Sequence, residues 1–141
     1  FSRFMAQAGI APYLAKFVTE IDPSPGMVVA FAAALFLVLG MFLDALGLLL
    51  LTLPILLPMF MAANLDLIWF GVLTVKFVEI GMITPPVGLN VYVLNTLVGD
   101  TVSLEEIFQG VFWFLACEVV ICGLLITFPE ISLVLVESMR R

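Results

Sequence analysis

The amino-acid sequence predicts an all-α integral membrane protein. Of its 141 residues, 64% are hydrophobic and 11% are charged, and the mean hydropathy is +1.28. Soluble domains are nearer half apolar and a quarter charged. Several apolar runs approach the roughly 20 residues of a transmembrane helix, and prolines and glycines interrupt two of them. A broken helix at membrane depth is tolerated where it is buried in protein or lines a polar cavity, so the breaks predict a solute or ion site.

The composition also argues against several function classes. The chain has no histidine, which excludes a histidine-based metal site or general base within it. With 5 basic and 11 acidic residues it has no basic patch for nucleic acid. Cys117 and Cys122, five apart in an apolar run, match no zinc or redox motif and are interpreted as small packing residues. We therefore expect neither an enzyme nor an organic cofactor.

Residues 1–26 are predicted to contain the end of a helix, an amphipathic segment at the membrane interface, and a turn. Charged residues are interspersed with apolar ones up to Asp22, as in helices that lie in the interface. Ser24 and Pro25 predict the cap and first residue of the following helix. The chain begins without an initiator Met or a signal-peptide pattern, so we expect a piece of a longer protein.

Two apolar runs, Met27–Leu43 and Leu48–Ala63, are joined by the segment Gly40-Met-Phe-Leu-Asp-Ala-Leu-Gly47. Each run gives about 25 Å of helix at 1.5 Å per residue, which is short for a hydrocarbon core about 30 Å thick. A pair of tight spans and a re-entrant hairpin both fit these lengths. An acid between glycines is costly in lipid but suits a tip buried in protein. We therefore favour the re-entrant helical hairpin, which would span residues 27–63.

Residues 64–99 are predicted to form one discontinuous transmembrane helix. The segment Gly81-Met-Ile-Thr-Pro-Pro-Val-Gly88 interrupts it with two consecutive prolines, which have no N–H to donate and clash with the preceding turn. Neither half is long enough to cross a membrane, but the two together are. Asn64 or Asp66 can cap the first half.

This break is the strongest candidate site in the sequence. Because Pro85 and Pro86 lack N–H groups, nearby carbonyls are expected to lose their helical partners, and Thr84 adds a hydroxyl. The carbonyls concerned are those of Gly81, Met82 and Ile83. A site made of oxygen atoms alone suits a hard cation such as Na⁺. The alternative is a proline kink whose carbonyls are satisfied by neighbouring helices.

Other polar residues allow two interpretations each. Asp44 can be a cation ligand at the hairpin tip or the cap of the returning helix. Asn90 lies close enough to the break to face a substrate cavity. Lys76 and Glu79, three apart, predict an intramembrane ion pair; direct contact of Lys76 with an anionic substrate is the alternative. Glu118 has no evident partner, and we expect it to meet a residue outside this chain.

Residues 100–141 are predicted to form the last transmembrane helix and a C-terminal tail. Ser103 and Glu106 have the spacing of a capping box, and the apolar run Ile107–Phe128 is the longest uninterrupted span.

The order and spacing of these motifs resemble the C-terminal part of the large membrane subunit of TRAP transporters, the tripartite ATP-independent periplasmic family. The resemblance runs through most of the chain. It rests on Leu39-Gly-Met-Phe-Leu-Asp44, Leu53-Pro-Ile-Leu-Leu-Pro58, Phe70-Gly-Val72, Glu79-Ile-Gly81 and Thr84-Pro-Pro-Val-Gly88.

The resemblance implies an elevator-type transporter of two inverted repeats, of which this chain is the C-terminal half, in the bacterial inner membrane. A periplasmic binding protein would deliver a carboxylate-bearing solute, and a small four-helix membrane subunit would complete the complex. Na⁺ would be the coupling ion, held by Gly40, Gly81 and Thr84, mostly through backbone. The substrate-binding residues would be Asp44, Thr84, Pro85, Pro86, Gly88 and Asn90. A stand-alone Na⁺/dicarboxylate symporter and a non-transporting scaffold subunit are the alternatives.

Overall fold

The computed structural model describes residues 24–99 and 101–139, and this part of the chain is helical without strands. The predicted interfacial segment before residue 24 lies outside the described residues. The helices are α3 (Pro25–Gly40), α4 (Ala45–Ala62), α5 (Leu67–Ile83), α6 (Leu89–Val98), α7 (Leu104–Thr127) and α8 (Glu130–Met139).

Side-chain caps begin four of these helices. Ser24 caps α3, with Pro25 in its first turn, and Asp66 caps α5. Ser103 and Glu106 form the complete capping box of α7. These three predictions are confirmed. Asp44 caps α4 by accepting hydrogen bonds of 3.1 Å from the backbone N–H groups of the next turn. The caps satisfy N–H groups that would otherwise lack partners at a helix start.

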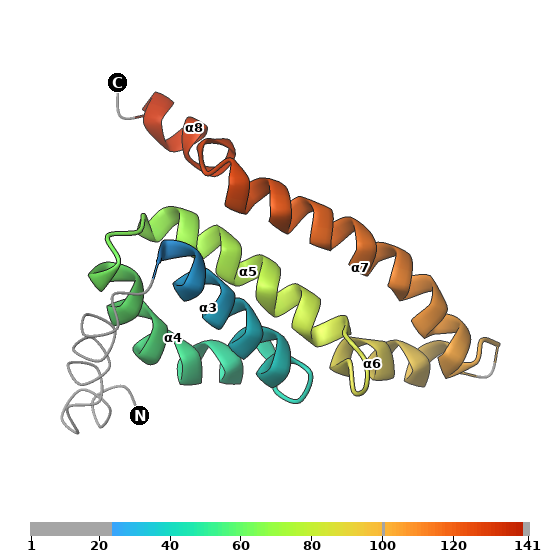
Figure 1. Ribbon diagram of the computed structural model, residues 1–141. Coiled ribbons are helices and arrows are strands. Elements are labelled where there is room, and N and C mark those ends of the chain that lie inside the picture. Colours follow the sequence, from blue (N-terminus) through green and yellow to red (C-terminus); the bar gives the residue numbers. More distant parts are fainter. Residues whose placement is uncertain (1–23, 100, 140–141) are drawn as a thin grey trace.

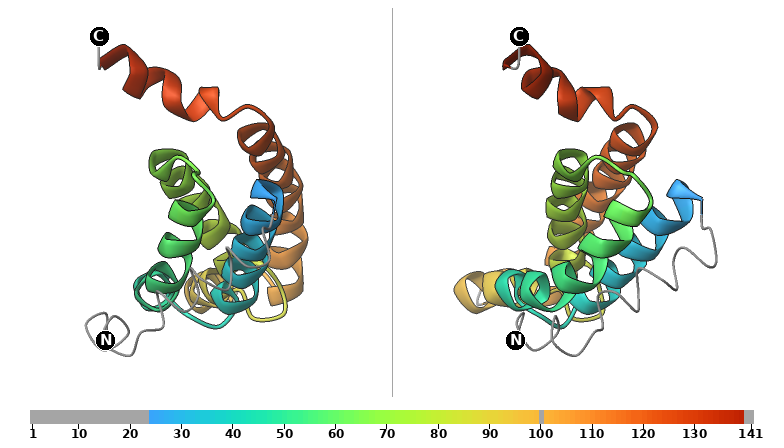
Figure 2. Two further views of the ribbon diagram at one scale, coloured as in Figure 1. Left: turned by 60° about the vertical axis from the view of Figure 1, so that its left-hand side comes forward. Right: turned by 90° about the vertical axis from the view of Figure 1, so that its left-hand side faces the viewer.

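The helices α3 and α5 lie side by side and begin at the same end of the molecule (Figure 1). The helix α4 returns from the end of α3, and α7 runs back along α5 in the opposite direction, as the two further views also show (Figure 2). The core lies between α3, α4 and α5, and its fully buried large side chains are Val28, Phe36, Leu48, Leu56, Phe60 and Leu73. The rings of Phe60 and Phe70 stack with centroids 3.8 Å apart.

Two helices among the described residues are long and apolar enough to cross a membrane, α4 and α7. The helix α4 continues through Pro54 and Pro58 and changes direction along its length (Figure 1). Many large apolar side chains are exposed, including Trp113 at 79% and Phe114 at 70% on α7. Such a surface suits lipid or other protein rather than water.

Candidate functional site

The end of α3 and the end of α5 meet through two glycines. A Cβ atom added to Gly81 would lie 2.8 Å from the carbonyl oxygen of Phe36 and 3.0 Å from the Cα of Gly40. A Cβ on Gly40 would lie 3.0 Å from the Cα of Gly81. Both residues are buried. Only glycine permits this backbone contact, which places the start of the hairpin tip against the helix before the break.

The break itself spans the residues between α5 and α6. The helix α5 ends at Ile83, the peptide bond between Pro85 and Pro86 is cis, and α6 begins after Gly88. Gly88 has φ 57° and ψ 69°, a left-handed conformation that glycine adopts without a Cβ penalty. A Cβ there would lie 3.2 Å from the carbonyl oxygen of Ile83. The chain therefore folds back on itself, so that Gly88 lies beside the last turn of α5.

The carbonyl groups of the break differ in part from the prediction. The expectation of a free Gly81 carbonyl is wrong, because it accepts a 3.2 Å hydrogen bond from the N–H of Thr84. This is a tighter turn of the kind that often ends a helix. The Thr84 hydroxyl donates to the carbonyl of Ile80 at 2.5 Å. The carbonyls of Met82 and Ile83 accept no hydrogen bond from the described residues; for Met82, the residue four positions later is Pro86, which has no N–H.

The hairpin tip adds another carbonyl of this kind. Beyond the end of α3, the N–H groups of Phe42 and Leu43 both donate to the carbonyl of Leu39, each at 3.0 Å. The carbonyl of Gly40 accepts no hydrogen bond from the described part of the chain. The tip and the break therefore each present backbone oxygens with free lone pairs, next to the contact between Gly40 and Gly81.

Four other predicted site residues are exposed, namely Asp44, Pro85, Pro86 and Asn90. Asp44 is exposed, and its carboxylate is bonded to the first turn of α4 rather than to the break. Asn90 is exposed on the first turn of α6, with no hydrogen bond from its side chain within the described ranges. Pro85 and Pro86 are exposed. Pro85 lines a hollow of about 480 Å³, together with the α7 residues Glu105, Phe108, Gln109, Phe112 and Trp113.

Contacts with α7 give the position of the break along that helix. Lys76 Nζ lies 2.9 Å from Glu118 Oε1, and a Cβ on Gly88 would lie 3.3 Å from the ring of Phe108. The break thus faces the first half of this 24-residue helix, because Gly88 lies beside Phe108 and Pro85 shares a hollow with residues from Glu105 to Trp113. At 1.5 Å per residue, the α7 residues that the break contacts lie within about 14 Å of the start of that helix.

Lys76 forms ion pairs with two acidic residues, one of which was predicted and one of which was not. The predicted ion pair of Lys76 with Glu79 is confirmed, at 2.8 Å. The expectation that Glu118 meets a residue outside this chain is wrong, because Lys76 contacts it from 42 residues away. The signal for this pair was present in the sequence, since Lys76 is the single basic residue between Lys16 and Arg140.

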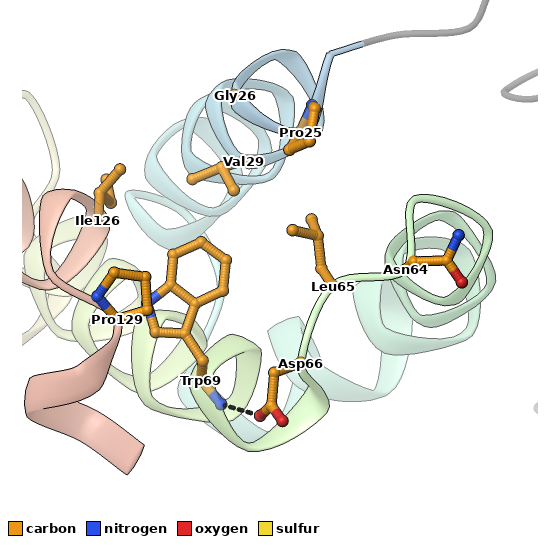
Figure 3. Close-up of a pocket in the computed structure, with 9 residues that line it drawn as sticks. All are labelled: Pro25, Gly26, Val29, Asn64, Leu65, Asp66, Trp69, Ile126 and Pro129. Atoms are coloured by element: carbon orange, nitrogen blue, oxygen red, sulfur yellow. Dashed lines mark hydrogen bonds between the residues drawn. The ribbon is translucent and has the colours of Figure 1, made fainter. Parts of the chain in front are cut away.

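A second polar contact joins α5 to α7 at the far end from the break. The indole Nε1 of Trp69 donates a 2.8 Å hydrogen bond to the carbonyl oxygen of Leu125. The N–H four residues after Leu125 would normally bond this carbonyl, but that residue is Pro129. Trp69 also lines a hollow of about 370 Å³ with residues of α3, the α4–α5 turn and the α7–α8 junction (Figure 3). The sequence reading missed this contact, although Pro129 was a signal for it.

Comparison with known proteins gives consistent matches. The DctM component of the tripartite ATP-independent periplasmic transporters matches residues 1–131. The chain is 39% identical over 131 residues, 93% of its length, to the sialic acid TRAP transporter permease protein SiaT of Haemophilus influenzae (strain 86-028NP), of which it covers 21%. It is 32% identical over 97% of its length to the large permease protein SiaM of Vibrio cholerae, of which it covers 32%.

A third relative carries a different substrate in its name. The chain is 34% identical over 99 residues, 70% of its length, to the C4-dicarboxylate TRAP transporter large permease protein DctM of Pseudomonas aeruginosa, covering 23% of that protein. No solved structure matches the chain. The chain spans about a fifth to a third of the length of these relatives. With the family match over most of its length, the chain belongs to the DctM-like large permease subunits of TRAP transporters.

Proposed function

We propose that this chain forms part of the large membrane subunit of a Na⁺-coupled secondary transporter that imports an organic anion. The observation that carries the proposal is the contact of Gly40 with Gly81, with backbone oxygens lacking partners on both sides of it. Unpaired backbone groups in an apolar environment cost free energy. A cation that replaces the missing N–H donors relieves that cost, which is why broken helices in transporters serve as ion sites.

The available ligands fit Na⁺ in kind. They are oxygen atoms: the carbonyls of Gly40, Met82 and Ile83 and the hydroxyl of Thr84, whose proton is donated to Ile80 and whose lone pairs stay free. Hard cations prefer oxygen ligands. No group of three or more His, Cys, Asp or Glu side chains that could hold a metal lies among the described residues. In this proposal Gly81 contributes the close approach of the two helices rather than a free carbonyl.

The proposed substrate is a carboxylate. The relatives are named for sialic acid and for C4-dicarboxylates, which share that group. The substrate would lie beside the Na⁺ ion and contact Asp44 at the tip and the residues of the break, namely Thr84, Pro85, Pro86, Gly88 and Asn90. The exposure of Asp44, Pro85, Pro86 and Asn90 is consistent with a role in contacting a solute.

The remaining parts of the proposal concern the whole transporter. The chain would be the C-terminal member of two inverted repeats, with residues 27–63 as a re-entrant hairpin and residues 64–99 as a discontinuous helix. Substrate would cross the bacterial inner membrane by an elevator-like movement. A periplasmic solute-binding protein would deliver it, and a small four-helix membrane subunit would hold the moving part in the bilayer.

Reconstitution of the full complex in proteoliposomes tests this function. Uptake of labelled sialic acid and of succinate, each with its binding protein, is expected to require an inward Na⁺ gradient. Equally fast uptake in K⁺-only buffer contradicts Na⁺ coupling. Na⁺-driven uptake without any binding protein identifies a stand-alone symporter instead, and no Na⁺ binding or uptake of any carboxylate identifies a scaffold subunit.

A further inference from the structure

Lys76, Glu79 and Glu118, the charged triad, carry one net negative charge close to the break. Lys76 Nζ lies 2.8 Å from Glu79 Oε2 and 2.9 Å from Glu118 Oε1. All 11 acidic residues of the chain lie between Lys16 and Arg140, and Lys76 is the single basic residue there. One ammonium therefore faces two carboxylates, and the second carboxylate charge is not balanced by any other basic residue of that stretch.

The triad is close to the proposed Na⁺ site along α5. Glu79 lies two residues before Gly81, which is about 3 Å along the helix axis, and Lys76 lies five residues before Gly81, which is about 7.5 Å. The side chains of Lys76 and Glu118 are largely shielded, with 22% and 21% exposed, whereas that of Glu79 is 56% exposed. Glu118 Oε2 is buried and has no hydrogen-bond partner among the described residues. Shielded charges interact over such distances more strongly than charges in water, and salt screens them less.

We propose that the net charge of this triad raises the Na⁺ affinity of the site at the hairpin tip and the break. The inference rests on the proposed function, because it assigns an electrostatic role beside that site. Lys76 with one carboxylate would be neutral and would leave the cation unaided. The second carboxylate makes the triad attractive to a cation, while Lys76 prevents two adjacent acids from repelling each other inside the membrane.

The alternative is that the triad only holds α5 against α7 and has no electrostatic effect on Na⁺. Three variants separate the electrostatic role from the structural one. Glu79→Gln removes the net charge and leaves the contact of Lys76 with Glu118 in place. Glu118→Gln removes the net charge and weakens that contact. The double variant Lys76→Gln/Glu118→Gln replaces the ion pair between α5 and α7 by two neutral amides but keeps a net charge of −1 through Glu79. Glu130→Gln, at the exposed start of α8, is the control for loss of one acid elsewhere.

The measurement is the Na⁺ concentration for half-maximal uptake by the full complex in proteoliposomes. For one unit charge about 10 Å away at an effective dielectric constant of about 20, affinity changes by roughly tenfold. We expect about a tenfold higher Na⁺ requirement for Glu118→Gln. For Glu79→Gln we expect a smaller, several-fold increase, because the Glu79 side chain is more exposed and its charge more strongly screened. The double variant and Glu130→Gln are expected to stay near the unmodified complex.

Other outcomes overturn the inference. An unchanged Na⁺ requirement in Glu79→Gln shows that the net charge does not act on the site. A raised Na⁺ requirement in the double variant shows that the tie between α5 and α7 matters instead of the charge. The Na⁺-dependent rise in melting temperature of the detergent-solubilised complex gives a second readout that does not need transport. If the double variant does not assemble, Glu79→Gln alone decides, since its helix contact is intact. Na⁺-independent uptake by the unmodified complex refutes the proposed function itself.

Discussion

The indole of Trp69 takes the place of a backbone N–H at the end of α7, where it donates to the carbonyl oxygen of Leu125 at 2.8 Å. Two polar contacts therefore hold α5 to α7. They are spaced seven residues apart on each helix, Trp69 with Leu125 and Lys76 with Glu118. Two points fix the direction and register of one helix along the other, and this positions the break opposite the first half of α7.

Loss of the Trp69 hydrogen bond should destabilise the protein. Trp69→Phe leaves the Leu125 carbonyl without a donor, at an expected cost of about 1–3 kcal/mol for an unsatisfied, partly buried group. We expect a melting temperature several degrees lower for the detergent-solubilised complex. Trp113→Phe is the matched control, because Trp113 is 79% exposed on α7. Equal melting temperatures for the two variants would show that Leu125 finds another donor.

Alanine at the contact of the two glycines should impair transport. In Gly81→Ala the new Cβ would lie 2.8 Å from the Phe36 carbonyl oxygen, so α3 and α5 must separate, at about 1–3 kcal/mol of overpacking strain. We expect uptake to fall at least tenfold. Gly71→Ala lies on the same helix and meets nothing within 4 Å, so its uptake should be unchanged. Normal uptake by Gly81→Ala would show that transport does not require the close contact between Gly40 and Gly81.

Thr84 should affect the Na⁺ requirement rather than the maximal rate. Thr84→Ala removes a hydroxyl oxygen from the proposed ligand set, and Thr84→Ser keeps it. We expect a several-fold higher Na⁺ concentration for half-maximal uptake in the alanine variant and a near-normal value in the serine variant. Thr96→Ala is a suitable control, since Thr96 also bonds a carbonyl of its own helix but lies exposed on α6. An unchanged Na⁺ requirement in Thr84→Ala removes Thr84 from the site.

Asp44 allows its two roles to be separated by the choice of substitution. Asparagine is as good a helix cap as aspartate, whereas alanine costs about 1 kcal/mol. If the charge of Asp44 serves the site, Asp44→Asn should keep its melting temperature and need several-fold more Na⁺ for uptake. Asp44→Ala should lose stability as well. Wild-type Na⁺ dependence in Asp44→Asn would leave Asp44 with the capping role alone, which Oδ2 performs for α4.

Features that depend on near neighbours in the chain were predictable. Ser24, Asp66 and the pair of Ser103 with Glu106 mark helix starts because a short polar side chain bonds N–H groups within the next turn. The family resemblance could also be recognised, from the order and spacing of short motifs along the chain. The error at Gly81 was also local: the prolines remove two donors, but the N–H of Thr84 remains and bonds the Gly81 carbonyl.

Contacts between distant helices could not be derived in this way. Trp69 meets Leu125 across 56 residues, and Lys76 meets Glu118 across 42. Periodicity does not say which face of α7 meets α5, because apolar residues surround the whole helix and its contacts are chosen by packing. The sequence contained a lone base and a proline-freed carbonyl as signals, but their partners became identifiable only once α7 was placed beside α5.

The contact between Gly40 and Gly81 has a consequence for how the site can open. A side chain that blocks a site can move away by changing rotamer, typically within nanoseconds. Gly40 and Gly81 have no side chain that could move in this way. The tip and the break can part only when a helix end shifts as a unit, which belongs to the slower microsecond-to-millisecond range. Spectroscopic labels placed on α3 and on α5 should therefore report release and closure with one shared rate constant.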